Sequence, residues 1–475
     1  MFTISNGCVI RDLRIDGNRE ALTAPTWENT IEILANGANA LIDNVEIING
    51  NEAIMLGGEN IVVKNCRLSN CGGNGLHFSG CNKARVDNCV IIGANLNNSM
   101  GNMGGCIKWC RKCTDIVVSN CWVENGKRGF GDIEGGDNCG IQLIGNTAKN
   151  CGYAVYVNAV VGFLKNIIIN GNRFIDCGSV RIDSWHEAAN DLIPLNIILS
   201  NNIFENCSLE LVRCSDIIIS NNIMKGNSYI HGQFVSDIKI SDNAINQTGD
   251  KQAGIHIEND NSNIEIVNNY IRSKGRVLAV KANACSVIGN SLWHNYADDN
   301  EWSAIIQCSG GNAMFKDNKV VSYKNGIELT GNSTYENNLF YMCGSQKQVF
   351  VDWGSTYYRI QNNRTNGTMI ADVNTSEKLI SNNSFPVHSN VFKTVSTTFE
   401  NITAKVQTTT ILGDDIECVL VASEGYSLPA SVTIKNNGQT AEVGFGYEYN
   451  QETGKLIIYK VRGDVSITAT ATATA

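Results

Sequence analysis

Proline, charge and long apolar runs are all scarce in this chain of 475 residues. Only 4 residues are proline and only 17% are charged. Proline has no backbone N–H, so its rarity is typical of a chain whose backbone is largely committed to β-sheet hydrogen bonds. No apolar run reaches about 18 residues, the length that a membrane-spanning helix needs. We therefore expect a β-rich protein with no membrane partner.

The chain also lacks basic character and a visible secretory signal. Its formal net charge is −9, whereas proteins that hold nucleic acid through its phosphates are usually basic. We expect no nucleic-acid partner. The opening residues MFTISNGCVIRD place no charged segment before an apolar one and start directly in a strand pattern. We expect the start to be truncated, or to be capped by another chain.

One eight-residue phrase recurs along the chain: apolar, any, apolar, any, Asn/Gly/Asp, Asn/Cys, any, apolar. Copies read IVVKNCRL at 61–68, IIISNNIM at 217–224 and IEIVNNYI at 264–271. The mean spacing between copies is about 25 residues. The sixth position of the phrase holds Leu13, Val45, Cys66, Cys89, Cys121, Asn146, Asn172, Asn202, Asn222, Asn243, Asn269, Asn290, Asn318, Asn338, Asn363 and Asn383.

Alternation of apolar residues with a period of two indicates β-strands. An Asn that returns at the same turn of every repeat predicts stacked coils whose side-chain amides hydrogen-bond to one another. Five residues after the sixth position lie Cys71, Cys151, Cys177, Cys207 and Cys343, which fits small buried residues in stacked turns. We expect these thiols to be reduced, because strand geometry seldom suits a disulfide. The phrase predicts an all-β fold, a parallel β-helix of about sixteen coils.

The repeat resembles the right-handed parallel β-helices of the pectate-lyase-like superfamily over residues 1–390. From about Val391 the Asn phrase gives way to short alternating runs separated by Gly, Asp and Asn, which predict a small antiparallel β-sandwich-like domain over 391–475. Its phrases ASEGYSLP (422–429), SVTI (431–434) and GDVSITA (463–469) resemble a small Ig-like module at the ends of phage tail and bacterial surface proteins. That resemblance implies a virion protein.

Each coil has a further strand before the phrase, and its middle residue is expected to point outward while its neighbours point inward. This interpretation gives one outward column with Glu32, Met55, His77, Lys108, Asp132, Tyr156, Arg181, Glu210, His231, His256, Ala279, Ile306, Glu328, Phe350 and Ala371. A second column, two residues further on, includes Ser79, Cys110, Glu134, Asn158, Asp183, Val212 and Glu258.

Functional groups concentrate in these columns between His77 and Glu210, beside the insertion DSWHEAANDLIP at 183–194. Aromatic rings beside carboxylates suit a sugar, whose C–H face packs on a ring while its hydroxyls need polar partners. A second aromatic and acidic loop, WHNYADDNEW, spans 293–302. The predicted sugar-binding residues are His77, Lys108, Tyr156, Asn158, Arg181, Trp185, His186 and Glu210.

Three carboxylates are the predicted catalytic groups: Asp132, Glu134 and Asp183. Strand and coil spacings put them about 7 and 9.6 Å apart, within the separation of about 6.5–9.5 Å that is typical of inverting glycosidases. The segments GDIE (131–134) and RID (181–183) resemble the motif order of polygalacturonase-like glycosidases. That family's His and Lys are missing here, so only Arg181 carries over.

Zinc binding by Cys106, Cys110, Cys113 and Cys121 is the alternative use of the CRKC segment. Structural zinc usually needs two such pairs at set spacing, and Cys121 already belongs to the ladder. We expect no metal and no cofactor.

The sequence leaves three functions open. The first is a phage tailspike or tail fibre protein that binds and depolymerises host cell-surface polysaccharide, with hydrolysis favoured over lyase chemistry. The second is a non-catalytic receptor-binding fibre, and the third a bacterial surface or secreted polysaccharide lyase or hydrolase. For the first we expect a homotrimer, contact with other tail proteins through the N-terminal end, synthesis in the bacterial cytoplasm, and action at the host surface.

Overall fold

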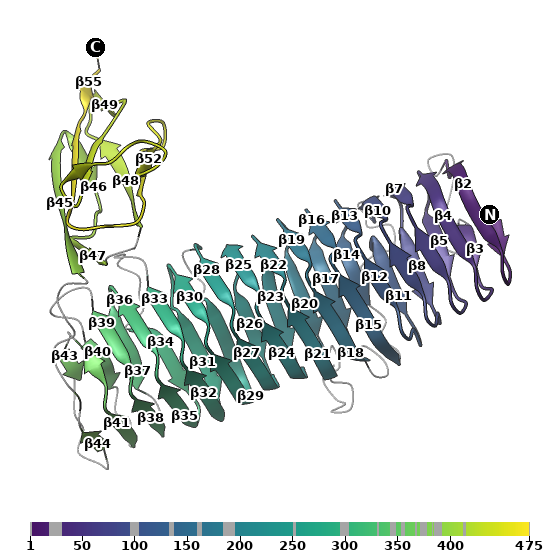
Figure 1. Ribbon diagram of the computed structural model, residues 1–475, viewed down its shortest axis with the longest axis horizontal. Helices are drawn as coiled ribbons and strands as arrows, with labels where there is room; N and C mark the ends of the chain where they lie inside the picture. The colour runs from purple at the N-terminus through teal and green to yellow at the C-terminus, as the bar shows by residue number, and fades with distance from the viewer. Residues whose placement is uncertain are drawn as a thin grey trace.

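The computed structural model describes residues 2–18, 31–95, 104–132, 137–158, 164–183, 195–249, 253–294, 304–329, 332–342, 348–352, 357–365, 368–370, 378–381, 383, 392–411 and 415–474. In the described ranges the chain forms a right-handed parallel β-helix followed by small sheets at the C-terminal end (Figure 1). The predicted fold class is confirmed. Among the described residues, no helix is long and apolar enough to cross a membrane.

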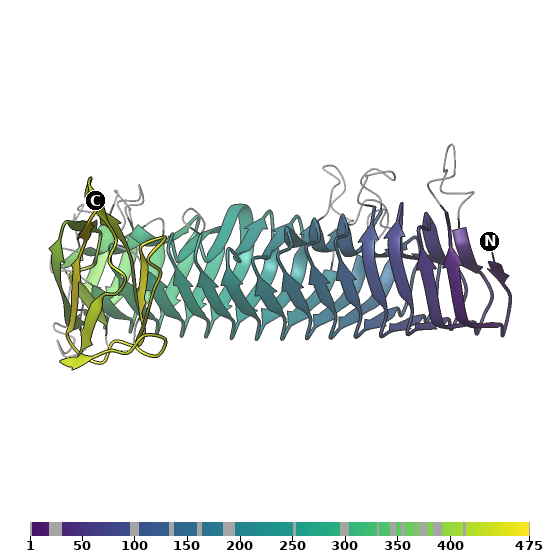
Figure 2. The same cartoon turned by 90° about the horizontal axis from the view of Figure 1, so that it is seen from above.

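The strands of the solenoid form three parallel sheets along its length, and a typical coil contributes one strand to each sheet (Figure 2). Sheet 1 consists of β1 (Phe2–Ile4), β3 (Ile31–Ala35), β5 (Glu52–Leu56), β8 (Leu76–Ser79), β11 (Ile107–Cys110), β14 (Arg128–Asp132), β17 (Tyr153–Asn158), β20 (Ser179–Asp183), β23 (Ser208–Val212), β26 (Ile230–Gln233), the first part of β29 (Ile255–Val267), β31 (Leu278–Ala282), β34 (Ala304–Ser309), β37 (Asn325–Leu329), β40 (Gln348–Asp352) and β43 (Thr368–Ile370).

Sheet 2 consists of β2 (Val9–Asp16), β4 (Leu41–Ile48), β6 (Val62–Lys64), β9 (Arg85–Asp87), β12 (Val117–Ser119), β15 (Asn138–Ile144), β18 (Leu164–Asn170), β21 (Leu195–Ser200), β24 (Ser215–Ser220), β27 (Ser236–Ser241), the end of β29, β32 (Ala284–Ile288), β35 (Asn312–Lys316), β38 (Ser333–Glu336), β41 (Tyr358–Gln361) and β44 (Lys378–Ser381).

Sheet 3 continues from the ends of β2 and β4 and consists of β7 (Arg67–Cys71), β10 (Val90–Ala94), β13 (Trp122–Glu124), β16 (Thr147–Lys149), β19 (Arg173–Ile175), β22 (Ile203–Glu205), β25 (Ile223–Gly226), β28 (Ala244–Gln247), β30 (Tyr270–Ser273), β33 (Ser291–His294), β36 (Lys319–Ser322), β39 (Leu339–Met342) and β42 (Arg364–Thr365).

The recurring phrase is the corner between sheets 2 and 3. Its fifth residue adopts the left-handed conformation in coil after coil, for example at Asn65 (φ 54°), Asn221 (φ 56°) and Gly289 (φ 68°). Gly and Asn enter this region at least steric cost. The turn geometry therefore explains why the fifth position alternates among Asn, Gly and Asp.

The sixth residue forms the predicted ladder. Asn222 Nδ2 donates to Asn243 Oδ1 at 2.9 Å, and the Asn222 backbone N–H donates to the same oxygen at 2.9 Å. The same Nδ2 also donates to the carbonyl of Leu199, at 3.0 Å. Side-chain bonds of this kind join Asn146, Asn172, Asn202, Asn222, Asn243, Asn269, Asn290, Asn318, Asn338, Asn363 and Asn383 in sequence.

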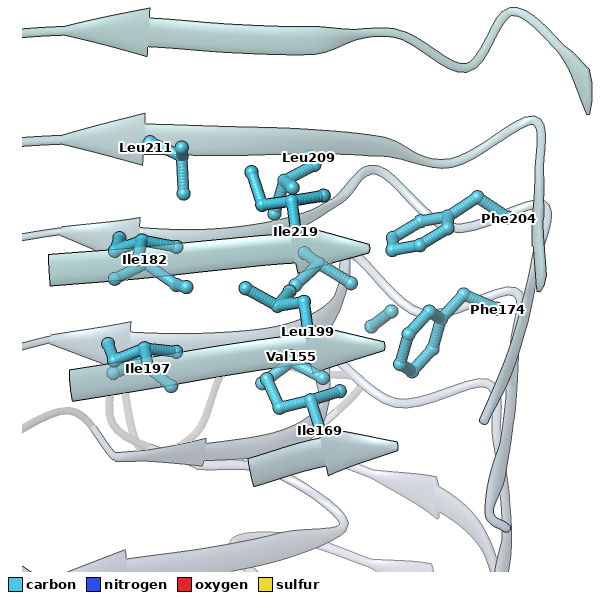
Figure 3. Packing of buried hydrophobic residues seen from close by; sticks show 14 of the residues in the cluster. Val155, Ile169, Phe174, Ile182, Ile197, Leu199, Phe204, Leu209, Leu211 and Ile219 are labelled. Carbon is cyan, nitrogen blue, oxygen red and sulfur yellow. The ribbon is translucent and has the colours of Figure 1, made fainter. Parts of the chain in front are cut away.

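Apolar side chains from all three sheets fill the interior of each coil (Figure 3). Val155 comes from sheet 1 and Ile169 from sheet 2, while Phe174 and Phe204 from sheet 3 lie over one another with ring centroids 5.2 Å apart. Like residues stack on like residues because neighbouring coils keep the same register. Stacking gives each coil a dry contact with the coil on either side.

The C-terminal residues form a separate domain with its own core. One sheet orders its strands as β47 (Thr409–Ile411), β45 (Phe392–Glu400), β54 (Val465–Thr470), β50 (Thr433–Asn436) and β51 (Gln439–Thr440). A second orders them as β46 (Ile402–Ala404), β48 (Ile416–Ala422), β53 (Lys455–Ile458) and β52 (Tyr447–Tyr449), and β49 (Tyr426–Ser427) pairs with β55 (Thr472–Ala473).

The two larger C-terminal sheets share one apolar cluster that includes Leu420, Ile434 and Ile467, so they pack as a sandwich. The predicted small antiparallel sheets are present at the C-terminal end, and one further pairing, that of β45 with β54, is parallel. Strands at opposite ends of a domain can meet in either direction, whereas hairpin neighbours must be antiparallel.

Most of the thiols are packing residues. All the described cysteines are free, and most are buried. In the ladder, the Sγ atoms of Cys66 and Cys121 donate to the carbonyls of Lys64 (3.2 Å) and Ser119 (3.1 Å) in their own turns. Burial raises the pKa of the Cys81 thiol to about 12, which keeps it protonated and unreactive near neutral pH.

Replacement of Asn222 by Leu is expected to destabilise the solenoid, because the amides of its ladder neighbours lose their partners while staying buried. Each buried polar group left without a partner costs about 1–3 kcal/mol. Urea denaturation followed by circular dichroism measures the loss. Lys225→Leu places the same side chain at an exposed position of β25 and serves as the control. Equal midpoints for the two variants would contradict a structural ladder.

Titration of the unfolded protein with a thiol reagent, without a reducing agent, is expected to detect nearly all 18 cysteines. The physical reason is that the stacked thiols lie in turns and strands whose geometry does not bring Sγ atoms into bonding position. Reduced protein provides the reference value. A count of only a few thiols would show that disulfides contribute to the fold.

Candidate functional site

Sheet 1 carries two outward columns of functional groups. Backbone pairing places Tyr156, Arg181, Glu210, His231 and His256 in one column on five consecutive coils. The second column, two residues further along each strand, holds Asn158, Asp183, Val212, Gln233 and Glu258. Neighbouring coils lie about 4.8 Å apart, so the five coils present a polar strip about 19 Å long.

Pairing further along sheet 1 corrects part of the predicted column. Gly131 pairs with Lys108 and Tyr156, so it takes the place that the sequence interpretation gave to Asp132. Gln307 and Val351 likewise replace Ile306 and Phe350, which are fully buried, and Leu34 replaces Glu32. At Asp132, Ile306 and Phe350 the shift is one residue, which exchanges the two faces of the strand. Glu32 and Leu34 are two residues apart, so there the face is as predicted and only the register differs.

Three predicted site residues form one ion-paired group, in which Arg181 lies between Asp183 and Glu210. Arg181 donates from Nε and Nη2 to Asp183 Oδ2 at 3.0 and 2.8 Å, and from Nη1 to Glu210 Oε2 at 3.0 Å. The side chains of Arg181 and Glu210 are 27% and 23% exposed, whereas that of Asp183 is 3% exposed. Burial alone would lower the pKa of Arg181, but Asp183 and Glu210 outweigh it and raise that pKa. The guanidinium is therefore a fixed positive charge on the outer face.

Tyr156 is packed into the same face. The Arg128 guanidinium lies 4.1 Å from the centre of its ring, and Asn158 Nδ2 donates to its hydroxyl at 3.0 Å. Burial, together with the charge of Asp183, raises the pKa of the Tyr156 hydroxyl. The residue is only 6% exposed, so its ring is not open to stack on a sugar as predicted. Its hydroxyl stays protonated near neutral pH and can serve as a hydrogen-bond donor.

His231, His256 and Glu258 form a second cluster at the end of the strip. Glu258 Oε1 lies 3.0 Å from His231 Nε2, Glu258 Oε2 lies 3.6 Å from His256 Nε2, and Gln233 Nε2 donates to Glu258. Burial lowers the pKa of His256, and the hydrogen bond from Gln233 lowers that of Glu258. One ligand atom from each of the three residues lies within 4.8 Å of the others, a spacing from which two imidazoles and a carboxylate can close on a divalent metal ion.

His77 and Lys108 lie together at the other end of the column, paired between β8 and β11. His77 Nδ1 is 3.2 Å from Glu52 Oε2, and His77 Nε2 is 3.1 Å from Cys110 Sγ. Glu52 Oε1 accepts a hydrogen bond from Asn74 Nδ2 at 2.7 Å. Glu52 and Cys110 were not among the predicted site residues. Glu52 begins β5 and Cys110 ends β11, and the two lie too far apart in the sequence for a local pattern to connect them.

Several predicted residues lie outside the described part of the chain. Glu134, Trp185 and His186 fall in the undescribed ranges, and for Asp132 only the backbone strand is described. The proposed separation of the three catalytic carboxylates therefore stays a prediction. Of the three, Asp183 has its position defined, as the buried partner of Arg181.

Sheet 3 carries an aromatic cluster that includes Trp293, the first residue of the predicted aromatic and acidic loop. The rings of Tyr270 and Trp293 have centroids 6.1 Å apart, and Lys319 Nζ lies 4.9 Å from the Trp293 ring and 5.5 Å from that of Tyr341. The rest of that predicted loop, residues 295–303, is outside the described ranges. The cluster is a second place where exposed rings meet polar groups.

Comparison with known proteins shows the fold. Residues 2–194 match the family described as the right handed beta helix region, and no curated protein matches the chain by sequence. Similar solved structures include PfbA, a surface adhesin of Streptococcus pneumoniae (13% identity, TM-score 0.41, covering 66% of this chain and 85% of that one). A mannuronic acid specific family 6 polysaccharide lyase from human gut microbiota has 13% identity and a TM-score of 0.37, with 71% and 82% covered.

The tailspike of the E. coli bacteriophage HK620, in complex with a hexasaccharide, is similar over more of the chain. It has 11% identity and a TM-score of 0.35, and the alignment covers 98% of this chain and 80% of that one. At these identities the likeness concerns the β-helix alone, a fold that hosts many functions. Any function for this chain must come from its own site.

The buried carboxyl of Glu32, close to Glu52, is expected to make the free energy of unfolding depend on pH. Burial raises the pKa of the Glu32 carboxyl from 4.5 to about 7. Between these pH values the unfolded chain loses the proton and the folded chain keeps it, so the free energy of unfolding falls as pH rises. Glu32→Gln should remove this dependence. The free energy of unfolding of the variant, relative to that of the parent, should therefore be higher at pH 8 than at pH 4, by up to about 3 kcal/mol.

Urea midpoints of both proteins at pH 4, 6 and 8 measure the difference. Glu59→Gln, at a carboxyl that is 48% exposed beside Lys83, is the matched control. If the gap between Glu32→Gln and the parent is the same at all three pH values, the carboxyl does not titrate as described.

Proposed function

We propose that the chain binds a polysaccharide along the outer face of sheet 1 and cleaves it, as a phage tailspike or tail fibre protein does at the host surface. The observation that carries the proposal is the polar strip on five consecutive coils, from Tyr156 to His256. A glycan has to be held at several successive sugars, and this strip repeats polar contacts at a regular interval along one straight line.

The chemistry of the strip suits hydroxyl-rich and anionic sugars. Arg181 presents a partly exposed guanidinium, which can hold a sugar carboxylate or two neighbouring hydroxyls. Glu210 and Glu258 have partly exposed carboxylates that accept hydrogen bonds from hydroxyls. The strip thus offers both hydrogen-bond donors and hydrogen-bond acceptors along the axis of the helix.

For cleavage, hydrolysis by Asp132, Glu134 and Asp183 is the first proposal. Backbone pairing places Asp183 in an outward column, whereas in β14 Gly131, and not Asp132, holds the outward position. The Arg181 salt bridge gives Asp183 a fixed place, which supports a positioning role for that carboxylate. Lyase chemistry is the second proposal, and His256 is the specific observation in its favour. Its lowered pKa keeps the imidazole neutral near pH 7, and a neutral imidazole can take the proton beside a uronate carboxylate.

The phage assignment is supported by the long unbranched solenoid and the small sandwich that follows it. It includes a homotrimer, contact with other tail proteins at the N-terminal end, and synthesis in the bacterial cytoplasm. A non-catalytic receptor-binding fibre and a bacterial polysaccharide enzyme are the alternatives. Light scattering that finds a monomer at micromolar concentration, together with absence of glycan cleavage, would favour these alternatives.

The test of binding compares two Arg–Glu pairs on the same two coils. Glu210→Gln and Arg181→Lys alter the sheet 1 pair, and Arg173→Gln alters the pair of Arg173 and Glu205 on sheet 3, whose atoms lie 3.2 Å apart. With a panel of bacterial surface polysaccharides, we expect the sheet 1 variants to weaken binding at least about tenfold, because they remove a charge or its geometry. Arg173→Gln should bind like the parent. If the parent and all three variants bind the polysaccharides with equal affinity, the strip is not the binding site.

Cleavage is measured on a polysaccharide that the parent protein binds. New reducing ends alone indicate hydrolysis, and added ultraviolet absorbance from a 4,5-unsaturated product indicates a lyase. Asp132→Asn, Glu134→Gln and Asp183→Asn should each reduce hydrolysis about a hundredfold or more, as loss of an acid–base group does, while His256→Gln should spare it. If all three carboxylate variants cleave the polysaccharide at the parent's rate, the reaction takes place at another site.

A further inference from the structure

A cysteine, a histidine and a glutamate are hydrogen-bonded in series on sheet 1, outside the polar strip. Cys110 Sγ lies 3.1 Å from His77 Nε2, and His77 Nδ1 lies 3.2 Å from Glu52 Oε2. Asn74 Nδ2 donates to the other oxygen of the same carboxylate at 2.7 Å. The imidazole is thus held between a thiol and a fixed carboxylate, the order in which a nucleophile, its base and the residue that orients the base are arranged.

Stacking of three consecutive coils produces this arrangement. Glu52 begins β5, His77 lies in β8, and Cys110 ends β11. Cys110 pairs with Ser79, so it belongs to the outward column of sheet 1. The ladder thiols differ from it, since the Sγ atoms of Cys66 and Cys121 donate to carbonyls within their own turns. The position of Cys110 is not explained by the packing of the turns.

Charge near the thiol favours its reactive form. The nucleophile is the thiolate, which positive groups stabilise. Lys108 lies two residues before Cys110 on the same face of β11 and pairs with His77. Glu52, 1% exposed, accepts the Nδ1–H of the imidazole, and this tautomer leaves Nε2 free to receive the thiol proton. Proton transfer from Sγ to Nε2 then gives a thiolate beside the imidazolium of His77.

We propose that Cys110, His77 and Glu52 form an acyl-transfer site that removes small O-acyl groups, such as acetyl, from the sugar hydroxyls of the bound polysaccharide; this substrate assignment rests on the proposed function. Cys110 is 3% exposed and His77 is 8% exposed, so only a small acyl group fits the approach. His77 lies three coil intervals from Tyr156 in the same column, about 14 Å at the spacing between coils. A glycan on the strip extends toward the thiol.

The reaction has two steps. His77 Nε2 takes the Cys110 proton, Sγ attacks the ester carbonyl carbon, and the C–O bond to the sugar breaks as Nε2 returns the proton to the leaving sugar oxygen. A water molecule then gives a proton to Nε2 and attacks the thioester carbonyl carbon, and the C–S bond breaks. Sγ recovers its proton from Nε2, so ester and water become alcohol and carboxylic acid. The carboxylate of Glu52 stabilises the imidazolium formed in each step.

Alkylation of the folded protein tests the nucleophile without any glycan. Iodoacetamide at pH 7, followed by peptide mass spectrometry, is expected to label Cys110 at least tenfold faster than Cys139, although Cys139 is the more exposed thiol. Glu52→Gln and His77→Asn should each slow labelling of Cys110 at least tenfold while Cys139 reacts as before. Circular dichroism confirms that each variant is folded. Labelling of Cys110 only after unfolding would overturn the proposal.

Hydrolysis of p-nitrophenyl acetate tests acyl transfer. The parent should release p-nitrophenol with an initial burst, and the peptide that contains Cys110 should carry one acetyl group after acid quenching. Cys110→Ser should abolish both signals, whereas Cys139→Ser should leave both unchanged. Rapid alkylation of Cys110 with neither acetylation nor hydrolysis would refute the acyl-transfer assignment. Because this ester needs no glycan, failure here leaves the polysaccharide proposal standing, and loss of glycan binding leaves this result intact.

Discussion

The solenoid depends on one hydrogen-bond arrangement at a turn. A residue in the left-handed conformation turns the chain at the corner. The Oδ1 of the asparagine after it accepts hydrogen bonds from the backbone N–H and from the Nδ2 of the ladder asparagine in the preceding coil. That oxygen satisfies a backbone group which would otherwise be buried without a partner at the corner. Since the coils from Asn146 to Asn383 repeat the arrangement, each of them is fixed in height and rotation relative to the next, and the three sheets stay in register over this part of the helix.

Fixed register is also what creates the site. A parallel strand pairs one residue with one residue, so a side chain on the outer face of sheet 1 has neighbours in the adjacent coils as well as two residues away in its own strand. Arg181 meets Glu210 because β20 and β23 are locked one above the other. The same constraint brings Glu52, His77 and Cys110 into line. Function on this fold therefore requires no folded loop, only the choice of residue at alternate positions of successive strands.

The repeat in the sequence was sufficient to predict the fold, because the turn imposes its residue types and the period is visible without a structure. The same alternation predicted that Arg181, Asp183 and Glu210 share a face. It failed at Asp132, where glycines at positions 129 and 131 leave little apolar pattern and the neighbouring insertion obscures the count of residues. The contact of Cys110 with His77 was out of reach, since it depends on how far each loop displaces the next strand, and the cysteine also fitted the pattern of buried turn thiols.

The ladder changes its chemistry partway along the helix. The first two rungs are apolar, Leu13 and Val45, and the next three are thiols. The thiols of Cys66 and Cys89 donate weakly to carbonyls of their own turn and of the preceding coil, whereas from Asn146 onward the rungs are joined by amide hydrogen bonds. In a one-dimensional stack, stability is the sum of contributions from units and from the contacts between them. The sixth position therefore contributes less to the contact between neighbouring coils in the N-terminal part of the helix, where Cys110 lies, than it does from Asn146 onward.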